Sequence, residues 1–161
     1  MIWQTNTTSS EDTERLGELL GSQLKGDEVI ELKSDLGGGK TTFTKGLVRG
    51  AGIKVRVSSP TFTLSRVYRG NDLQIDHFDF YRLNDAGILA EQLSESINRS
   101  NTVVVVEWAD IVKDVLPESR LSIEFVPQAD SQEARQVKFE YPEAMSRIIS
   151  EVENQWQEAR A

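Results

Sequence analysis

The glycine-rich segment at residues 34–42, SDLGGGKTT, constrains the fold of this 161-residue chain more than any other segment. It matches the phosphate-binding pattern G-x-x-x-x-G-K-[ST], except that Ser34 stands where the first glycine is expected. An apolar run at 29–32 precedes it, and a segment suited to a helix follows at 40–51. This order of strand, loop and helix is what phosphate binding by main-chain N–H groups requires.

Each residue type in this loop has a physical role. Gly37, Gly38 and Gly39 lack side chains that would keep backbone N–H groups away from phosphate oxygens. Lys40 supplies a point charge to the β- and γ-phosphates, and the Thr41 hydroxyl can coordinate Mg²⁺. The amino end of the following helix adds its positive dipole end. A side chain at position 34 would strain the turn if the backbone there had a positive φ.

The remaining hydrophobic pattern alternates short apolar runs with amphipathic segments. The β-branched run at 102–106 suits a strand buried on both faces, as in a parallel sheet covered by helices. We therefore expect a single α/β domain over residues 1–161, a P-loop NTPase-like three-layer sandwich with a mostly parallel central sheet and a C-terminal antiparallel hairpin. Strands are predicted at 29–32, 61–68, 73–80, 102–106, 121–126 and 137–141, and helices from Ser9 or Ser10, Lys40, Asn84 or Asp85, and Pro142.

Charge and composition narrow the functional classes. The chain has 18 basic and 26 acidic side chains, which give a net charge of −8. Residues 33–82 hold nine Lys and Arg against four Asp, so this segment is +5 and the rest is −13. This distribution favours a localised anion site over independent binding of nucleic acid.

Zero cysteines and one histidine exclude thiolate and multi-histidine metal sites and leave oxygen ligands for a hard cation. The sequence has neither a long apolar span nor the pattern of a signal peptide. A cytoplasmic protein without membrane contact is therefore expected.

Two carboxylates are candidates for the second part of a nucleotide site. Glu107 follows the buried strand at 102–106, at the edge of the sheet where ligands bind in open α/β folds. Asp79 shares one face of an extended segment with His77. Glu107 could bind Mg²⁺ or orient the attacking water, and an ordinary strand-end acid is the alternative. His77 is more often a hydrogen-bonded structural residue, and Trp108 is expected to pack over the sheet edge.

The segment Ser58–Thr63 places several hydroxyls around Pro60. Ser59 or Thr61 could sense the γ-phosphate, as switch segments do. A proline-terminated entry to the next strand explains the same residues equally well.

Taken together, these motifs resemble the bacterial TsaE family, the small ATPase of tRNA threonylcarbamoyladenosine biosynthesis. The resemblance rests on DLGGGKTTFTKGL (35–47), SPTFTL (59–64), HFDFYRL (77–83) and VVVEW (104–108), with LPESRLSIEF and then EAR (133–135) also similar. The departures are Ser34, where the family usually has Gly, and Gly38, where it commonly has Ala.

The resemblance implies a P-loop α/β fold that binds ATP and Mg²⁺. It implies that Gly37, Gly38, Gly39, Lys40, Thr41 and Thr42 cradle the phosphates, that Thr41, Asp79 and Glu107 serve the magnesium site, and that Lys40, Asp79 and Glu107 carry the catalysis. Ser10 or Thr13 is expected near the adenine. The partners implied are proteins of the TsaB and TsaD type, through which the chain would act on tRNA, with the transfer reaction carried out by TsaD.

Two other functions fit parts of the pattern. A small P-loop kinase would use Arg66, Arg69 or Arg82 over the phosphates of a metabolite acceptor. A nucleotide-gated assembly factor would bind ATP or ADP with negligible hydrolysis, a reading to which Ser34 gives some weight.

Overall fold

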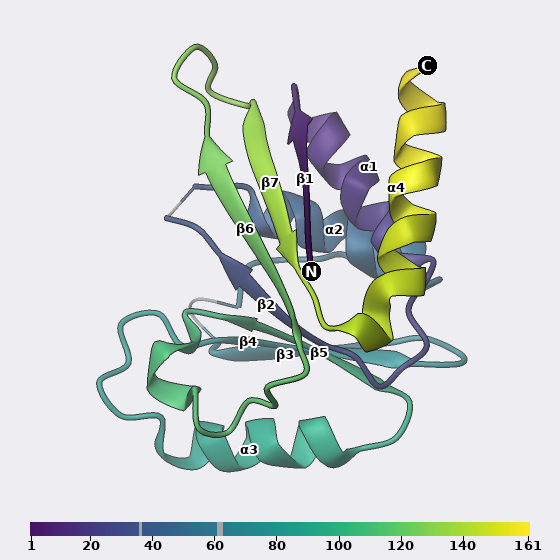
Figure 1. The fold of residues 1–161 in the computed structure, drawn as a ribbon. Helices are drawn as coiled ribbons and strands as arrows, with labels where there is room; N and C mark the ends of the chain where they lie inside the picture. Colours follow the sequence, from purple (N-terminus) through teal and green to yellow (C-terminus); the bar gives the residue numbers. More distant parts are fainter. Residues whose placement is uncertain (36, 61–62) are drawn as a thin grey trace.

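The computed structural model describes residues 1–35, 37–60 and 63–161, which form a seven-stranded sheet flanked by helices (Figure 1). The strands are β1 (Ile2–Thr7), β2 (Val29–Lys33), β3 (Ser65–Arg69), β4 (Gln74–Asp79), β5 (Thr102–Glu107), β6 (Leu121–Pro127) and β7 (Arg135–Glu140). The α-helices are α1 (Ser10–Gly21), α2 (Lys40–Gly50), α3 (Gly87–Asn98) and α4 (Ser146–Arg160), and short 3₁₀ turns lie at η1 (Ala109–Val112) and η2 (Glu143–Met145).

The sheet is mixed, with a parallel centre. Its order is β1-β7-β6-β2-β5-β4-β3, and the four neighbours β6, β2, β5 and β4 run parallel. The edge pairs β3–β4, β6–β7 and β7–β1 are antiparallel. The run at 103–106 is fully buried in the centre, as its β-branched composition predicts. The carboxyl ends of the central strands therefore meet at one edge.

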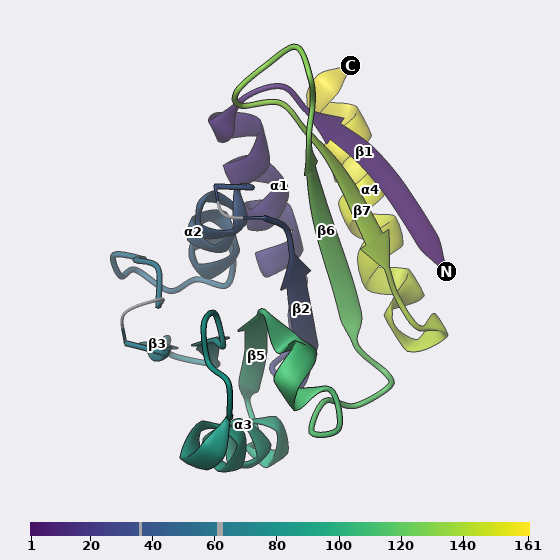
Figure 2. The same ribbon diagram turned by 90° about the vertical axis from the view of Figure 1, so that its left-hand side faces the viewer.

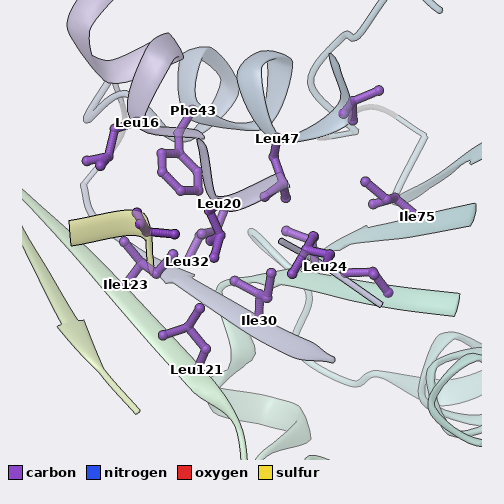
Figure 3. Packing of buried hydrophobic residues seen from close by; sticks show 14 of the residues in the cluster. Leu16, Leu20, Leu24, Ile30, Leu32, Phe43, Leu47, Ile75, Leu121 and Ile123 are labelled. Atoms are coloured by element: carbon purple, nitrogen blue, oxygen red, sulfur yellow. The ribbon is translucent and has the colours of Figure 1, made fainter. Parts of the chain in front are cut away.

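Helices cover the two faces of the sheet unequally. In Figure 1, α3 lies beneath the sheet, while α1, α2 and α4 lie on the other side. Figure 3 shows the larger core, where leucines and a phenylalanine of α1 and α2 meet the apolar side chains of the strands: Leu16, Leu20, Phe43 and Leu47 against Ile30, Leu32, Leu121 and Ile123. This packing fixes α2, and with it the loop at its amino end, against β2. The expected three-layer sandwich is confirmed.

Several local features differ from the sequence-based prediction. The strand β1 was not predicted, because Ile2 is exposed and the segment forms a strand only by pairing with β7, near the other end of the chain. Helix α3 begins at Gly87, with Ala86 rather than Asn84 or Asp85 at its cap. The side chain of Asp85 still accepts a hydrogen bond from the Gly87 N–H. Neither difference moves the site, which lies on the central strands.

The strand predicted at 61–68 is observed as β3 from Ser65, with residues 61 and 62 outside the described part of the chain, and the helix predicted from Pro142 begins at Ser146, after the short turn η2. The remaining predicted boundaries agree to within two residues. Ser9 caps α1 through its side chain, which accepts from the Asp12 N–H. The hairpin of β6 and β7 has one buried face and one wet face, as its alternation predicts. Over the described residues, no helix is both long and apolar enough to cross a membrane.

Candidate functional site

A cavity of about 310 Å³ lies at the carboxyl edge of the parallel strands, beside the amino end of α2. Its walls come from the glycine-rich loop, the start of α1, the ends of β4 and β5, and the loop between β6 and β7. The lining residues are Ser10, Thr13, Gly37, Gly38, Gly39, Lys40, Thr41, Thr42, Ser59, Asp79, Glu107, Trp108, Gln132, Glu133 and Arg135. The residues that the sequence predicts for phosphate, adenine, magnesium and catalysis therefore all line one cavity.

The glycine-rich loop adopts backbone conformations that need glycine. Gly37 has φ of +76° and Gly39 has φ of +105°, both in the left-handed region that other residues rarely adopt. Gly39 caps α2 without a side-chain hydrogen bond, so the first N–H groups of that helix remain directed at the cavity end. Leu36 lies outside the described residues. The loop thus has the features of an anion cradle.

Lys40 is buried at the floor of this cradle. Its Nζ donates a hydrogen bond to the Ser34 carbonyl at 2.9 Å and lies 3.9 Å from Oε1 of Glu107. It also sits 4.4 Å from the centre of the Trp108 ring. Burial lowers the pKa of Lys40, and the carboxylates of Glu107 and Asp79 partly counteract that shift. A bound anion would further stabilise the charged ammonium.

Asp79 and Glu107 lie side by side because β4 and β5 are parallel and in register at these two residues. Both side chains are almost fully buried. One oxygen of Asp79, Oδ1, accepts a hydrogen bond from the Tyr81 N–H at 2.9 Å. The predicted pair of carboxylates therefore does converge beside Lys40.

His77 contacts Glu107 directly, which sequence spacing alone did not establish. Its Nε2 lies 2.6 Å from Oε2 of Glu107, and the ring is 1% exposed. Within the described residues, Nδ1 of His77 is buried with no hydrogen-bond partner. A proton on Nε2 makes the contact a hydrogen bond to the carboxylate and leaves Nδ1 as an unused acceptor. His77 is thus a structural support of Glu107.

Ser34 stands at the first glycine position of the phosphate-binding pattern, and its side chain does not strain the backbone there. Its backbone is not among those with positive φ, and its hydroxyl donates to the Asp35 carbonyl at 2.8 Å. A Cβ built on Gly38 would lie 2.2 Å from Oγ of Ser34. The two departures from the family pattern therefore occupy the same space: the serine side chain fits because position 38 has none.

The β6–β7 hairpin contributes cavity residues that were not among the predicted site residues. Gln132, Glu133 and Arg135 form the wall opposite the start of α1, and Figure 2 shows the β6–β7 loop and that end of α1 at the same end of the sheet. Oγ of Ser10 donates to Oε1 of Glu133 at 3.1 Å, which joins the two walls. The signal in the sequence was the segment EAR (133–135), which resembles the family and in which Arg135 becomes buried.

The remaining candidates are placed as follows. Ser59 lines the cavity, whereas Thr61 lies outside the described residues. Trp108 both packs against Tyr81, at 4.9 Å between ring centres, and lines the cavity. Arg66 and Arg69 lie on β3, and Arg82 stacks on the Tyr81 ring. Among the described residues, the arginine that lines the cavity is instead Arg135.

The cavity offers oxygen ligands for part of a metal's coordination shell, which suits Mg²⁺ better than a metal whose ligands all come from the protein. In residues 1–35, 37–60 and 63–161, no three Asp, Glu or His side chains form a ready-made metal cluster. Asp79, Glu107 and the Thr41 hydroxyl instead supply two carboxylates and one neutral oxygen to the same space. Mg²⁺ usually takes one or two carboxylates and completes its shell with water and phosphate oxygens. This donor set therefore fits the ion.

Comparison with known proteins agrees with the geometry. Residues 7–137 match the family model described as threonylcarbamoyl adenosine biosynthesis protein TsaE. The tRNA threonylcarbamoyladenosine biosynthesis protein TsaE of Bacillus subtilis is 39% identical over 118 residues, 73% of each chain. The protein of the same name from Treponema pallidum is 38% identical over 76% of this chain and 90% of its own.

A solved structure extends the likeness to nearly the whole fold. The crystal structure of YdiB from Bacillus subtilis superposes with a TM-score of 0.80 at 29% identity and covers 96% of both chains. The family model, the relatives and the fold agree, and the chain belongs to the TsaE family.

Proposed function

We propose that this chain is the Mg²⁺-dependent ATP-binding and ATP-hydrolysing subunit of a cytoplasmic complex that forms threonylcarbamoyladenosine in tRNA. One observation carries the proposal: the glycine loop, Lys40 and the pair Asp79 and Glu107 line a single cavity. The relatives named above are tRNA threonylcarbamoyladenosine biosynthesis proteins, and this supports the pathway.

Each residue has a defined task in this proposal. The N–H groups of residues 37–42 and the Lys40 ammonium bind the phosphates. Thr41, Asp79 and Glu107 would hold Mg²⁺, which neutralises charge on the phosphate oxygens. Glu107 also orients the attacking water, with its carboxylate held by His77. Ser10 and Thr13 lie on the wall proposed to face the adenine.

The acidic remainder of the chain agrees with an indirect role on tRNA. Outside the segment 33–82 the net charge is −13, which opposes independent binding of a polyanion. In this proposal, partners of the TsaB and TsaD type hold the tRNA and carry out the transfer, and hydrolysis here drives or resets their cycle.

The test compares Lys40→Ala with Lys45→Ala, an exposed lysine on the same helix. Calorimetry with ATP and Mg²⁺ should show binding weakened by about tenfold to a hundredfold in the first variant only. ATP hydrolysis by the wild-type chain should be slow when the chain is alone and faster when both partners and tRNA are added. In that complete mixture, Lys40→Ala should fail to sustain tRNA modification.

Two outcomes would replace the proposal. If modification proceeds fully with Lys40→Ala, the chain is an assembly factor for which hydrolysis is dispensable. If loss of ATP instead tracks phosphorylation of an added small metabolite, the chain is a kinase.

A further inference from the structure

Arg135, the first residue of β7, is a buried cation whose hydrogen bonds go to main-chain carbonyls. Its Nε donates to the Gly38 carbonyl at 2.9 Å and its Nη2 to the Gly37 carbonyl at 3.1 Å. Its Nη1 donates at 2.8 Å to both Gln132 and Ala134. No salt-bridge partner lies within 4.0 Å of it among the described residues. A buried charge without a carboxylate is costly, which indicates that it serves a purpose other than stability alone.

The loop that Arg135 contacts is rich in glycine, and the Gly38 N–H also bonds the Asp35 carbonyl at 3.1 Å. Gly37 and Gly39 have positive φ, and glycine crosses between backbone regions at little energetic cost. A phosphate cradle works only while its N–H groups face the anion, because a carbonyl turned toward phosphate repels it. Carbonyls bonded to a guanidinium cannot turn in this way without losing charge-assisted hydrogen bonds.

The guanidinium suits this task better than an ammonium would. Its planar fork presents several N–H groups in fixed directions, so one side chain reaches two successive carbonyls of the loop and two of the hairpin. It also brings a positive charge to the wall of the cavity. The loop and the hairpin, 97 residues apart in sequence, are thereby joined at one point.

We propose that Arg135 is a positioning residue that fixes the Gly37 and Gly38 carbonyls and so presets the loop for phosphate. The role in nucleotide affinity rests on the proposed function. The role in ordering the loop does not, because it concerns the protein without ligand.

The test uses Arg135→Lys and Arg135→Ala beside Arg120→Lys and Arg120→Ala. Arg120 also donates to a carbonyl, that of Pro117, and to Glu31, but it precedes the opposite end of β6. Hydrogen exchange of the ligand-free protein should show faster exchange in residues 37–41 for both Arg135 variants, and the Arg120 variants should leave this segment at the wild-type rate.

Nucleotide affinity should separate the Arg135 variants from the Arg120 variants in the same way. We expect Arg135→Lys to weaken ATP and ADP binding by about tenfold and Arg135→Ala by up to about a hundredfold, with KM affected more than kcat. Methylguanidinium at millimolar concentration should restore part of the affinity of Arg135→Ala and none of that lost in Lys40→Ala. The Arg120 variants should bind within about twofold of wild type.

The proposal is overturned if loop exchange is unchanged in both Arg135 variants. It is also overturned if exchange rises evenly over the whole chain, because Arg135 would then support only global stability. If the wild-type protein binds no nucleotide, the proposed function fails, while loop exchange still decides the role of Arg135.

Discussion

Two buried polar clusters lie on opposite faces of β4, and they are built in different ways. The Asp76 cluster faces α3: one carboxylate oxygen accepts from Ser96 at 2.6 Å and Arg99 at 3.0 Å, and the other accepts from Gln74 at 2.8 Å. The Glu107 cluster consists of Lys40, Asp79 and Glu107, which line the cavity, and of His77, which contacts Glu107.

The difference lies in how completely each carboxylate is satisfied. Both oxygens of Asp76 have donors within hydrogen-bond distance. In Glu107, Oε2 lies 2.6 Å from His77, but Oε1 lies 3.9 Å from the Lys40 ammonium, beyond a hydrogen bond. A closed cluster stabilises the fold, whereas an open one keeps charge available for a ligand. Changes in the first cluster should therefore alter stability, and changes in the second should alter chemistry.

The largest expected effect is that of Glu107→Gln on hydrolysis. The amide keeps the shape of the side chain but loses the charge proposed to orient water, so the rate with partners should fall about a hundredfold, or about 2.7 kcal/mol. ATP affinity should stay within about threefold, because the loop and Lys40 remain. Steady-state kinetics and calorimetry measure the two quantities separately.

Glu124→Gln is the matched control, since Glu124 is exposed on the wet face of β6. It should leave both rate and affinity unchanged. If Glu107→Gln weakened ATP binding as much as it slowed hydrolysis, Glu107 would belong to the binding machinery alone.

Asp76→Ala should have the next largest effect, on the free energy of unfolding. It removes the acceptor of buried Ser96, and we expect a loss of about 2 kcal/mol in urea unfolding. ATP affinity of the folded variant should stay within about twofold of wild type, because the cluster faces away from the cavity.

Asp72→Ala, in the exposed turn between β3 and β4, should cost less than about 0.5 kcal/mol. An equal loss in both variants, or a parallel loss of ATP affinity in Asp76→Ala, would show that the two faces of β4 are not independent.

The sequence predicted the site best where function depends on local spacing. The glycine loop, Lys40 and Thr41 follow from a continuous motif, and the convergence of Asp79 with Glu107 follows from parallel strands ending at one edge. The contact of His77 with Glu107 could not be predicted, because it depends on the register of two strands whose residues are 30 apart.

The place of Arg135 in the cavity and the strand β1 escaped prediction for the same reason, although the segment 133–135 was noted as similar to the family. Arg135 bonds to carbonyls 97 and 98 residues earlier, and β1 exists through its pairing with β7. Ser34 and Gly38 show a second limit of prediction from sequence. Each is visible as a departure in the sequence, but their mutual fit depends on an Oγ-to-Cβ distance that only the folded loop defines.

The smallest expected effects come from removing the basic partner of each buried carboxylate. Arg99→Gln should lower the free energy of unfolding by no more than about 1 kcal/mol, because the Arg99 side chain is 47% exposed and Ser96 and Gln74 still bond Asp76. Hydrolysis should be unchanged.

His77→Gln should do the reverse: Glu107 loses its 2.6 Å partner while Lys40 remains at 3.9 Å. The Glu107 carboxylate is then less fixed, so the rate of hydrolysis should fall about fivefold to tenfold, or about 1 kcal/mol. Its stability should change little, since the buried Nδ1 without a partner is removed together with the ring. Urea unfolding and partner-stimulated hydrolysis, measured on both variants, give a two-by-two comparison. If His77→Gln lost stability but kept its rate, the Glu107 cluster would be as closed as the Asp76 cluster, and the distinction between the two faces of β4 would fail.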